Sequence, residues 1–195
     1  MLTDTDAQAM HLVQVAQDGD YAAIIKLYQR YNLLVFRTAV LLLGDHAHAE
    51  EAAQDVFEQF AQRVRTYQPA RGAFTAWLYQ VTINMCRGVY RRTRLRAWLS
   101  LDRVLRSGFD ISDGAPSPLQ QLLRDEAHRQ VWEAIQRLPF KLRAVVVLRY
   151  YHNFSYAETA QVLRCPIGAV RSRLLAAHDR LRNDLDEVYN VLPTD

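Results

Sequence analysis

The chain has 195 residues, half of them hydrophobic, with a formal net charge of +3, so one large or two small domains with an ordinary core can form. Two cysteines exclude a disulfide framework and paired zinc spacing, which fits a reducing cytoplasm, and we expect no metal and no other cofactor. No apolar run reaches the roughly 20 residues of a membrane span and the start MLTDTDAQ lacks signal-peptide features, so we expect no membrane insertion and a cytoplasmic location.

Helical periodicity runs through almost the whole chain, without sustained period-two alternation, and therefore predicts an all-α fold. Asp20 is suited to cap a helix whose apolar stripe spans residues 24–42, Tyr28 included, and which ends near Gly44. Asp45 is suited to cap a second long helix, which stops before Pro69. The acidic first turns of this second helix match the positive end of the helix dipole.

The segment YQPARG at 67–72 has the proline and glycine of a loop, and a third helix follows it. Its core stripe consists of Phe74, Trp77, Leu78, Val81 and Met85. We assign Trp77 to this core rather than to a surface that stacks on bases. A further stripe contains Tyr79, Ile83, Cys86 and Tyr90, and the sequence does not distinguish packing from binding there.

The stretch NMCRGVYRRTRLRAW at 84–98 is basic and contains no carboxylate, and residues 59–101 contain no Asp or Glu at all. An exposed helix that needs only solubility normally mixes charges of both signs, so this composition favours an anionic partner. The polar face is formed by Gln80, Asn84, Arg87 and Arg91, which recur at intervals of four, three and four residues. One face of the third helix is therefore expected to pack while another binds.

Beyond Leu99 the sequence SLDRVLRSGFDISDGAPSP breaks helical periodicity and predicts a linker. Two helices are predicted after it, over Leu119–Leu138 and Leu142–Tyr151. Ser155 and Glu158 then have the spacing of a capping box at the start of a short helix.

A tight turn separates that short helix from a longer one, in whose first turn Pro166 is favoured. The longer helix directs Val170, Leu174, Ala177, Leu181 and Leu185 to one side and Arg171, Ser172 and Arg173 elsewhere. Such a pair predicts a helix-turn-helix whose second helix enters the DNA major groove. Helical hairpins that do not bind DNA share this pattern. Taken alone, the pattern therefore leaves open a hairpin without a DNA-binding function.

Four collinear stretches carry a family resemblance: HAEEAAQDVF at 48–57, RGAFTAWLYQVTINMCR at 71–87, LPFKLRAVVVLRYYHNFSYAETAQVL at 138–163 and CPIGAVRSRL at 165–174. Together they resemble the extracytoplasmic-function (ECF) type of bacterial RNA polymerase sigma factor, of the sigma-70 family. The resemblance implies two small helical domains, a region 2 bundle at 1–98 and a region 4 helix-turn-helix domain at 119–195, joined by a flexible linker at 99–118. It implies promoter-specific transcription initiation by core polymerase and no catalytic activity of the chain itself.

The resemblance also implies three sets of binding residues. The minus-ten element, read as melted single strand, would contact Arg71, Phe74, Tyr79, Val81, Asn84, Arg87, Arg91 and Arg92. The minus-thirty-five duplex would contact Arg149, Arg171, Ser172 and Arg173, although Ala176 and His178 stand where relatives often carry arginines. The clamp helices of the largest polymerase subunit would contact Gln54, Asp55 and Phe57. The second domain would bind the flap of the other large subunit, and an anti-sigma factor is expected to cover these polymerase-binding surfaces.

Two alternatives of other classes remain. A helix-turn-helix repressor or activator would use the C-terminal hairpin on duplex DNA without forming a holoenzyme. A helical metal-dependent hydrolase would use His46, His48, Glu51 and Asp55, but exposed acids and histidines near a helix start explain these residues more simply. The sequence contains no phosphate loop, nucleophile elbow or catalytic triad that would support an enzyme.

Overall fold

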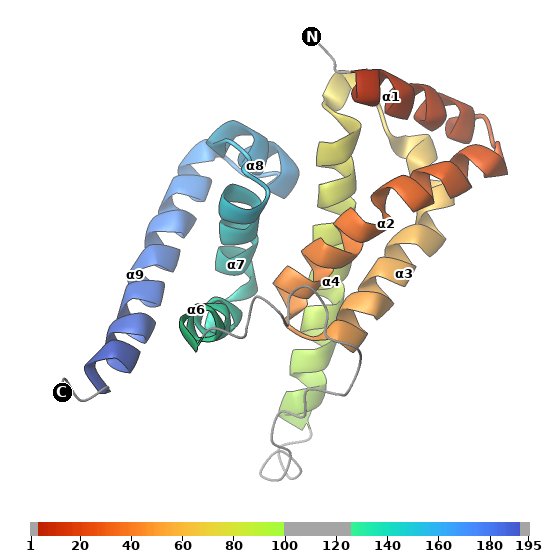
Figure 1. Ribbon diagram of the computed structural model, residues 1–195. Coiled ribbons are helices and arrows are strands. Elements are labelled where there is room, and N and C mark those ends of the chain that lie inside the picture. Colours follow the sequence, from red (N-terminus) through yellow and green to blue (C-terminus); the bar gives the residue numbers. More distant parts are fainter. Residues whose placement is uncertain (1–3, 100–125, 192–195) are drawn as a thin grey trace.

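The computed structural model describes residues 4–99 and 126–191, and all of this part is helices and short connections (Figure 1). The predicted linker beyond Leu99 and the start of the helix predicted over Leu119–Leu138 lie outside the described residues. Among the helices described, none is long and apolar enough to cross a membrane.

The first domain is a bundle of four helices. They are α1 (Asp4–Gln17), α2 (Tyr21–Leu43), α3 (His46–Arg63) and α4 (Phe74–Leu99), and the 3-10 turns η1 (Val64–Thr66) and η2 (Pro69–Arg71) connect the last two. Figure 1 shows α2, α3 and α4 side by side, with α1 across the end of the bundle where α2 begins. Helix α1 was not predicted from the sequence. It buries Ala9, Val13 and Ala16, and the partly buried Met10, Leu12 and Val15 pack against the same core.

The predicted helix boundaries of this domain are confirmed by their caps. The Asp20 carboxylate accepts hydrogen bonds from the backbone N–H groups of residues 22 and 23, at 2.7 and 3.3 Å. The Asp45 carboxylate accepts one from His48 N at 2.7 Å. Gly44 ends α2 in the left-handed conformation, with φ 75°, which glycine adopts without steric cost. These local signals fix where α2 ends and α3 begins.

The core of the first domain is rich in aromatic rings. Phe60 lies at its centre, 6.1 Å from the ring centroids of both Phe74 and Trp77, and Tyr67 closes one side. The apolar stripe predicted on α2 is buried at Leu27, Tyr31, Val35 and Leu42. The prediction that Tyr28 belongs to this buried stripe is wrong, because 43% of the Tyr28 surface is exposed.

The second domain contains α6 (Glu126–Arg137), α7 (Phe140–Val146), α8 (Tyr156–Leu163) and α9 (Ile167–Val191), and α7 continues into a π-helical turn, η4 (Val147–Tyr151). The capping box of α8 is complete: Glu158 N donates to Ser155 Oγ, and Ser155 N donates to Glu158 Oε2 at 2.7 Å. A left-handed Arg164 ends α8 and turns the chain toward α9. This geometry confirms the predicted helix-turn-helix pair.

The two domains share one buried apolar cluster. Its first-domain side includes the stripe Tyr79, Ile83 and Cys86, which the sequence left unassigned. Its second-domain side includes Phe140, Ala144, Val147, Leu148 and Val162. Figure 1 shows α7 and α8 lying along the same side of α4. The stripe is therefore packing. Tyr79 contacts the rings of His152 and Phe154 in the second domain, and the same cluster includes Ala39, Leu42, Ala49 and Ala52 of the first domain.

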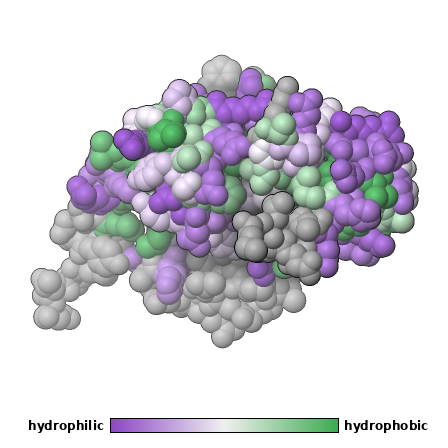
Figure 2. All heavy atoms as spheres, turned by 90° about the horizontal axis from the view of Figure 1, so that it is seen from above, coloured by the Kyte–Doolittle hydropathy of each residue, from purple (hydrophilic) through white to green (hydrophobic). Residues whose placement is uncertain are grey.

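The face seen in Figure 2 is mostly hydrophilic, with hydrophobic residues in small separate groups. Hydrophobic residues scattered in this way are normal on a protein surface.

Candidate nucleic-acid interface

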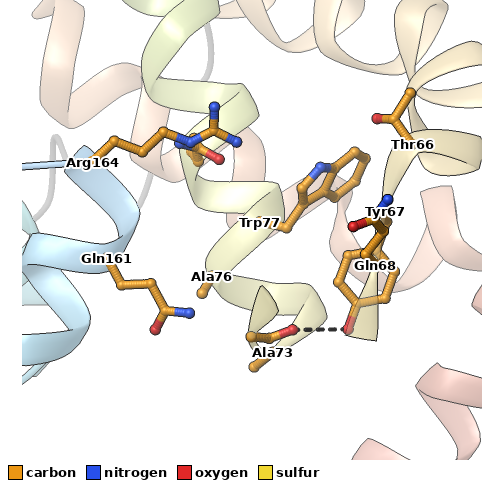
Figure 3. A pocket seen from close by; sticks show the side chains of 10 residues that line it. Thr66, Tyr67, Gln68, Ala73, Ala76, Trp77, Gln161 and Arg164 are labelled. Carbon is orange, nitrogen blue, oxygen red and sulfur yellow. Dashed lines mark hydrogen bonds between the residues drawn. The ribbon is translucent and has the colours of Figure 1, made fainter. Parts of the chain in front are cut away.

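The loop between α3 and α4 borders a cavity of about 430 Å³. Tyr67 Oη donates a hydrogen bond to Gly72 O at 3.0 Å and so holds the loop in place. Gly72 has φ +131°, a conformation that residues with a Cβ rarely adopt. The cavity is lined by Thr66, Tyr67, Gln68, Gly72, Ala73, Ala76, Trp77 and Gln80 of the first domain and by Gln161 and Arg164 of the second (Figure 3).

The lining of this cavity suits an unstacked nucleotide. Trp77 is only partly buried: its ring stacks on Phe74 at 5.5 Å and 29°, and it also borders the cavity. Gln68 and Gln80 add amide groups that pair with base edges, and Arg164 adds a cation. An aromatic surface beside hydrogen-bonding side chains and a cation is the usual composition of single-strand binding sites.

The residues expected to read the minus-ten element fall into two groups. Phe74, Tyr79 and Val81 are buried, with at most 6% of their surface exposed, while Asn84 and Arg91 are exposed. Burial raises the pKa of Tyr79 to about 12, so its hydroxyl stays protonated. The backbone of Arg71 belongs to η2, and its side chain lies outside the described residues.

The positive charge of the basic stretch on α4 is partly neutralised by carboxylates of the neighbouring helix α3. Arg92 Nη2 lies 2.9 Å from the carboxylate of Glu51 and 3.8 Å from that of Asp55 on α3. Arg87 donates to Asn84 Oδ1 at 3.3 Å and lies over the Phe140 ring of the second domain at 5.9 Å. The acids missing from the local sequence therefore come from α3, and Arg91 remains the exposed cation of the predicted polar face.

The recognition helix α9 presents Arg171 and Ser172 to solvent near its N-terminal end. Arg149 of η4 and Arg171 both lie over the Tyr156 ring, at 4.7 and 5.9 Å from its centroid. Tyr156 thus keeps Arg149, the predicted phosphate contact, and Arg171, the predicted base contact, on the same surface. Arg173 is half-buried and donates toward Cys165 Sγ at 3.5 Å, so it is less available than its two neighbours.

The predicted duplex-binding set does not include Leu175, which is 64% exposed one turn after Arg171. Its signal in the sequence is an aliphatic residue four positions after Arg171, and aliphatic side chains suit contact with a thymine methyl group. His178, one of the two departures from the family pattern, bonds through Nε2 to Tyr150 Oη at 2.7 Å.

The residues expected to meet the polymerase clamp lie together on α3. Gln54 is exposed and donates to Glu58 Oε1 at 2.8 Å, and Phe57 packs edge-on against Tyr28 at 4.6 Å. The half-exposed Tyr28 and Phe57 rings give this surface an apolar element.

The nearby histidines are engaged in local pairs. His48 Nδ1 lies 2.9 Å from Asp45 and His46 Nδ1 lies 3.5 Å from Glu50. In the described part of the chain, no three His, Cys, Asp or Glu side chains gather where they could hold a metal ion.

Comparisons with known proteins identify the class to which this protein belongs. Residues 27–104 match the family model for sigma-70 region 2, and residues 128–181 match the model for sigma-70 region 4. The RNA polymerase sigma-H factor of Pseudomonas aeruginosa is 31% identical over 183 residues, covering 91% of this chain and 93% of that protein. The ECF RNA polymerase sigma-E factor of Escherichia coli is 30% identical over 179 residues, covering 88% and 91%.

Two solved structures share the fold. CnrH, in complex with the cytosolic domain of CnrY, aligns with a TM-score of 0.64 and 23% identity, covering 93% of this chain and 99% of that chain. The sigma factor RpoE of Bartonella quintana, in complex with the anti-sigma factor NepR, aligns with a TM-score of 0.62 and 21% identity, covering 83% and 95%.

The chain belongs to the ECF-type sigma factors of the sigma-70 family. It directs promoter-specific transcription initiation through its region 2 and region 4 domains, as a non-catalytic subunit of RNA polymerase. This result confirms the predicted family, fold class and function, and it replaces the repressor and hydrolase alternatives.

Proposed function

We propose that the first domain, residues 1–98, captures the minus-ten element as a melted strand on the α3–α4 loop and on the polar face of α4. The observation that carries this proposal is the cavity beside Trp77, which combines an aromatic surface, the amide groups of Gln68 and Gln80, and one cation, Arg164 of the second domain. An unstacked base enters the cavity, while Asn84, Arg87 and Arg91 contact the strand outside it. Unstacking costs a few kcal/mol, so sequences that melt easily are selected.

Within this proposal the buried members of the predicted set act indirectly. Phe74 supports the Trp77 ring from the core, with ring centroids 5.5 Å apart, and Val81 lines a smaller pocket that shares Trp77 and Gln80 with the cavity. Arg71 lies on the loop between α3 and α4. Tyr79 becomes available only when the second domain moves away from α4. Arg92 supports the strand contact weakly, because Glu51 and Asp55 already neutralise it.

We propose that the second domain, residues 119–195, reads the minus-thirty-five element as duplex. Arg171 and Ser172 face the major groove, with Leu175 beside them, while Arg149 contacts phosphate and Arg173 plays a smaller part. A linker at residues 99–118 connects the two DNA-binding domains.

We also propose that both domains dock on core polymerase. Gln54, Asp55 and Phe57 of α3 meet the clamp helices of the largest subunit, and the second domain meets the flap of the other large subunit. This activity requires a cytoplasmic location, where the polymerase is. CnrH and RpoE of Bartonella quintana form complexes with CnrY and NepR, and by analogy an anti-sigma factor covers these docking surfaces in this chain.

Salt dependence of strand binding tests the minus-ten proposal. Each lost phosphate contact reduces the number of counterions released on binding. For a single strand, this changes the slope of log affinity against log salt concentration by about 0.7 per contact. Arg91→Ala is expected to lower this slope, whereas Arg180→Ala, an exposed arginine on α9, is the matched control and leaves it unchanged. Equal slopes for Arg91→Ala and the native chain, measured by fluorescence anisotropy, would reject the proposed strand path.

A further inference from the structure

We propose that helix α1 holds the α3–α4 loop (residues 64–73) in the shape that accepts a base, with Gln17 as the positioning residue. The match to sigma-70 region 2 begins at residue 27, so α1 (Asp4–Gln17) lies outside it. The effect on base selection rests on the proposed minus-ten function, whereas the contacts between α1 and the loop stand on their own.

Gln17 ties the end of α1 to the start of the loop. Its Nε2 donates to Val64 O at 2.9 Å and to Tyr67 O at 2.8 Å. Both acceptors are carbonyl oxygens, so both N–H bonds of the amide are used and its orientation is fixed. Val64 and Tyr67 are the C-cap residues of α3 and η1, where backbone carbonyls run out of helical partners. A side chain of α1 thus supplies hydrogen-bond donors where the chain leaves α3.

Tyr67 carries this restraint to the other end of the loop. It is 4% exposed, and its ring packs edge-on against Phe74 at 5.4 Å and lies 5.8 Å from the Trp77 ring. The dashed line at Tyr67 in Figure 3 marks the bond from its hydroxyl to Gly72 O. Burial raises the pKa of Tyr67, so the hydroxyl stays protonated and remains a donor. The residue that Gln17 holds by its carbonyl therefore also holds Gly72.

Met10 gives α1 a second contact with the same tyrosine. Its Sδ lies 3.5 Å from Tyr67 Oη. Met10 and Gln17 are seven residues apart, which is about two helical turns, so they lie on the same face of α1. Helix α1 therefore contacts Tyr67 at its carbonyl through Gln17 and at its hydroxyl through Met10.

These restraints determine the shape of the cavity rim. Gln68, whose amide lines the cavity, directly follows Tyr67, and Gly72, with φ +131°, donates through its backbone N–H to Pro69 O at 3.2 Å. Because Tyr67 also packs near Trp77, the separation between the Gln68 amide and the aromatic wall depends on Tyr67. A loop already in its bound shape loses little freedom on binding and favours the base that fits it.

Gln17 lies outside the cavity lining, so it acts on the strand through the loop. Neither Gln17 nor the protonated Tyr67 carries a charge, and loss of their hydrogen bonds leaves the phosphate contacts and the salt slope unchanged. A loosened loop fits every base less precisely, so the preference for one base over the others falls. A residue that only stabilised the fold would lower the affinity for all strands equally.

Gln17→Met tests the proposal because it removes both donors and keeps an unbranched side chain. Gln14→Met, the same change at an exposed position of α1, is the matched control. Tyr67→Phe is a second test, which keeps the ring and removes only the bond to Gly72 O. Water replaces part of the lost bonding at the half-buried Gln17, so we expect an effect of about fivefold from either change.

Two measurements separate the position of the loop from its effect on DNA. Hydrogen exchange of the backbone at residues 64–74, measured in the full chain by mass spectrometry, should be about fivefold faster in Gln17→Met and Tyr67→Phe than in Gln14→Met or the native chain. Holoenzymes assembled with host core polymerase are then given a pool of short single strands of randomised sequence, and the bound strands are sequenced. At the most strongly selected position, the ratio of best to worst base should fall about fivefold in the same two variants.

Equal exchange rates in Gln17→Met and Gln14→Met would overturn the positioning role of α1. Faster exchange with an unchanged base preference, or an equal loss of affinity on every strand, would overturn its effect on base selection. If the native holoenzyme selected no base at any position, the minus-ten proposal itself would fail, and the exchange rates would still decide whether Gln17 holds the loop. If Gln17→Met lost helicity, Tyr67→Phe, which leaves α1 unchanged, would decide whether the loop restraint sets base preference.

Discussion

Acidification should separate the two domains through His152, whose ring contacts Thr38 and Tyr79 of the first domain. The form in which the domains pack together is called docked below, and the separated form is called open. Burial lowers the pKa of His152 from 6.5 to about 4, and the docked ring accepts a hydrogen bond at the nitrogen that would take the proton. Tyr79 of α4 and Tyr151 of η4 are the titratable groups that contact the ring, while α2 contributes Thr38 and the loop before α8 contributes Phe154. Among the described residues, no carboxylate pairs with the ring to stabilise its charged form.

The direction and size of the effect follow from proton linkage. Because the pKa is lower in the docked form, docking is fully stable above the ordinary pKa of 6.5 and loses stability as the pH falls from 6.5 toward 4. Between pH 7.5 and pH 5.5 the ratio of docked to open chains falls by about tenfold, or about 1.4 kcal/mol. This is an upper value, because part of the ring contacts water, which reduces the penalty for charging it.

Energy transfer between dyes on the two domains measures this ratio. Suitable exposed positions are Gln62 on α3 and Asp179 on α9, each changed to Cys in a chain that also carries Cys165→Ser. Transfer should fall between pH 7.5 and 5.5 while helicity by circular dichroism stays constant. His152→Gln, which cannot titrate, should keep its transfer constant over the same interval. An unchanged native signal, or an equal response of the glutamine variant, would refute the role of His152.

Three further results are expected. Arg171→Ala should relax preference at particular duplex positions by about 1–3 kcal/mol, and an equal loss of affinity on every sequence would mean that Arg171 contacts phosphate only. Leu175→Ala should weaken binding specifically to sites with a thymine at one position, measured by competition between otherwise identical duplexes. Ser155→Ala removes the cap of α8 and should lower the free energy of unfolding by about 1 kcal/mol in urea titrations, whereas Ser172→Ala, which caps no helix, should change it much less.

Local signals in the sequence were sufficient to predict much of the fold. Asp20, Asp45 and the Ser155–Glu158 pair each bond to backbone within three residues, so their neighbours in the sequence determine the outcome. The missed helix α1 shows the limit of this approach. Its fully buried residues Ala9, Val13 and Ala16 are small, and the larger Met10, Leu12 and Val15 are only partly buried, so its apolar stripe is weak in the sequence.

The candidate site was harder to predict because its important contacts join distant parts of the chain. The Tyr79 ring packs against His152, 73 residues away, and against Phe154, and the spacing of the stripe contains no information about those partners. The acids that pair with Arg92 likewise come from α3, although the local sequence around Arg92 contains none. Periodicity gives the direction of a side chain but not the element that meets it.

Transcription from host genomic fragments by core polymerase, with and without the purified chain, tests the central claim most directly. Mapping of transcript 5′ ends should reveal start sites that appear only when the chain is added and that share two upstream sequence elements. Arg91→Ala should reduce initiation at these sites, and a template already melted at the minus-ten element should partly restore it. Start sites indistinguishable from those of core polymerase alone would contradict the account.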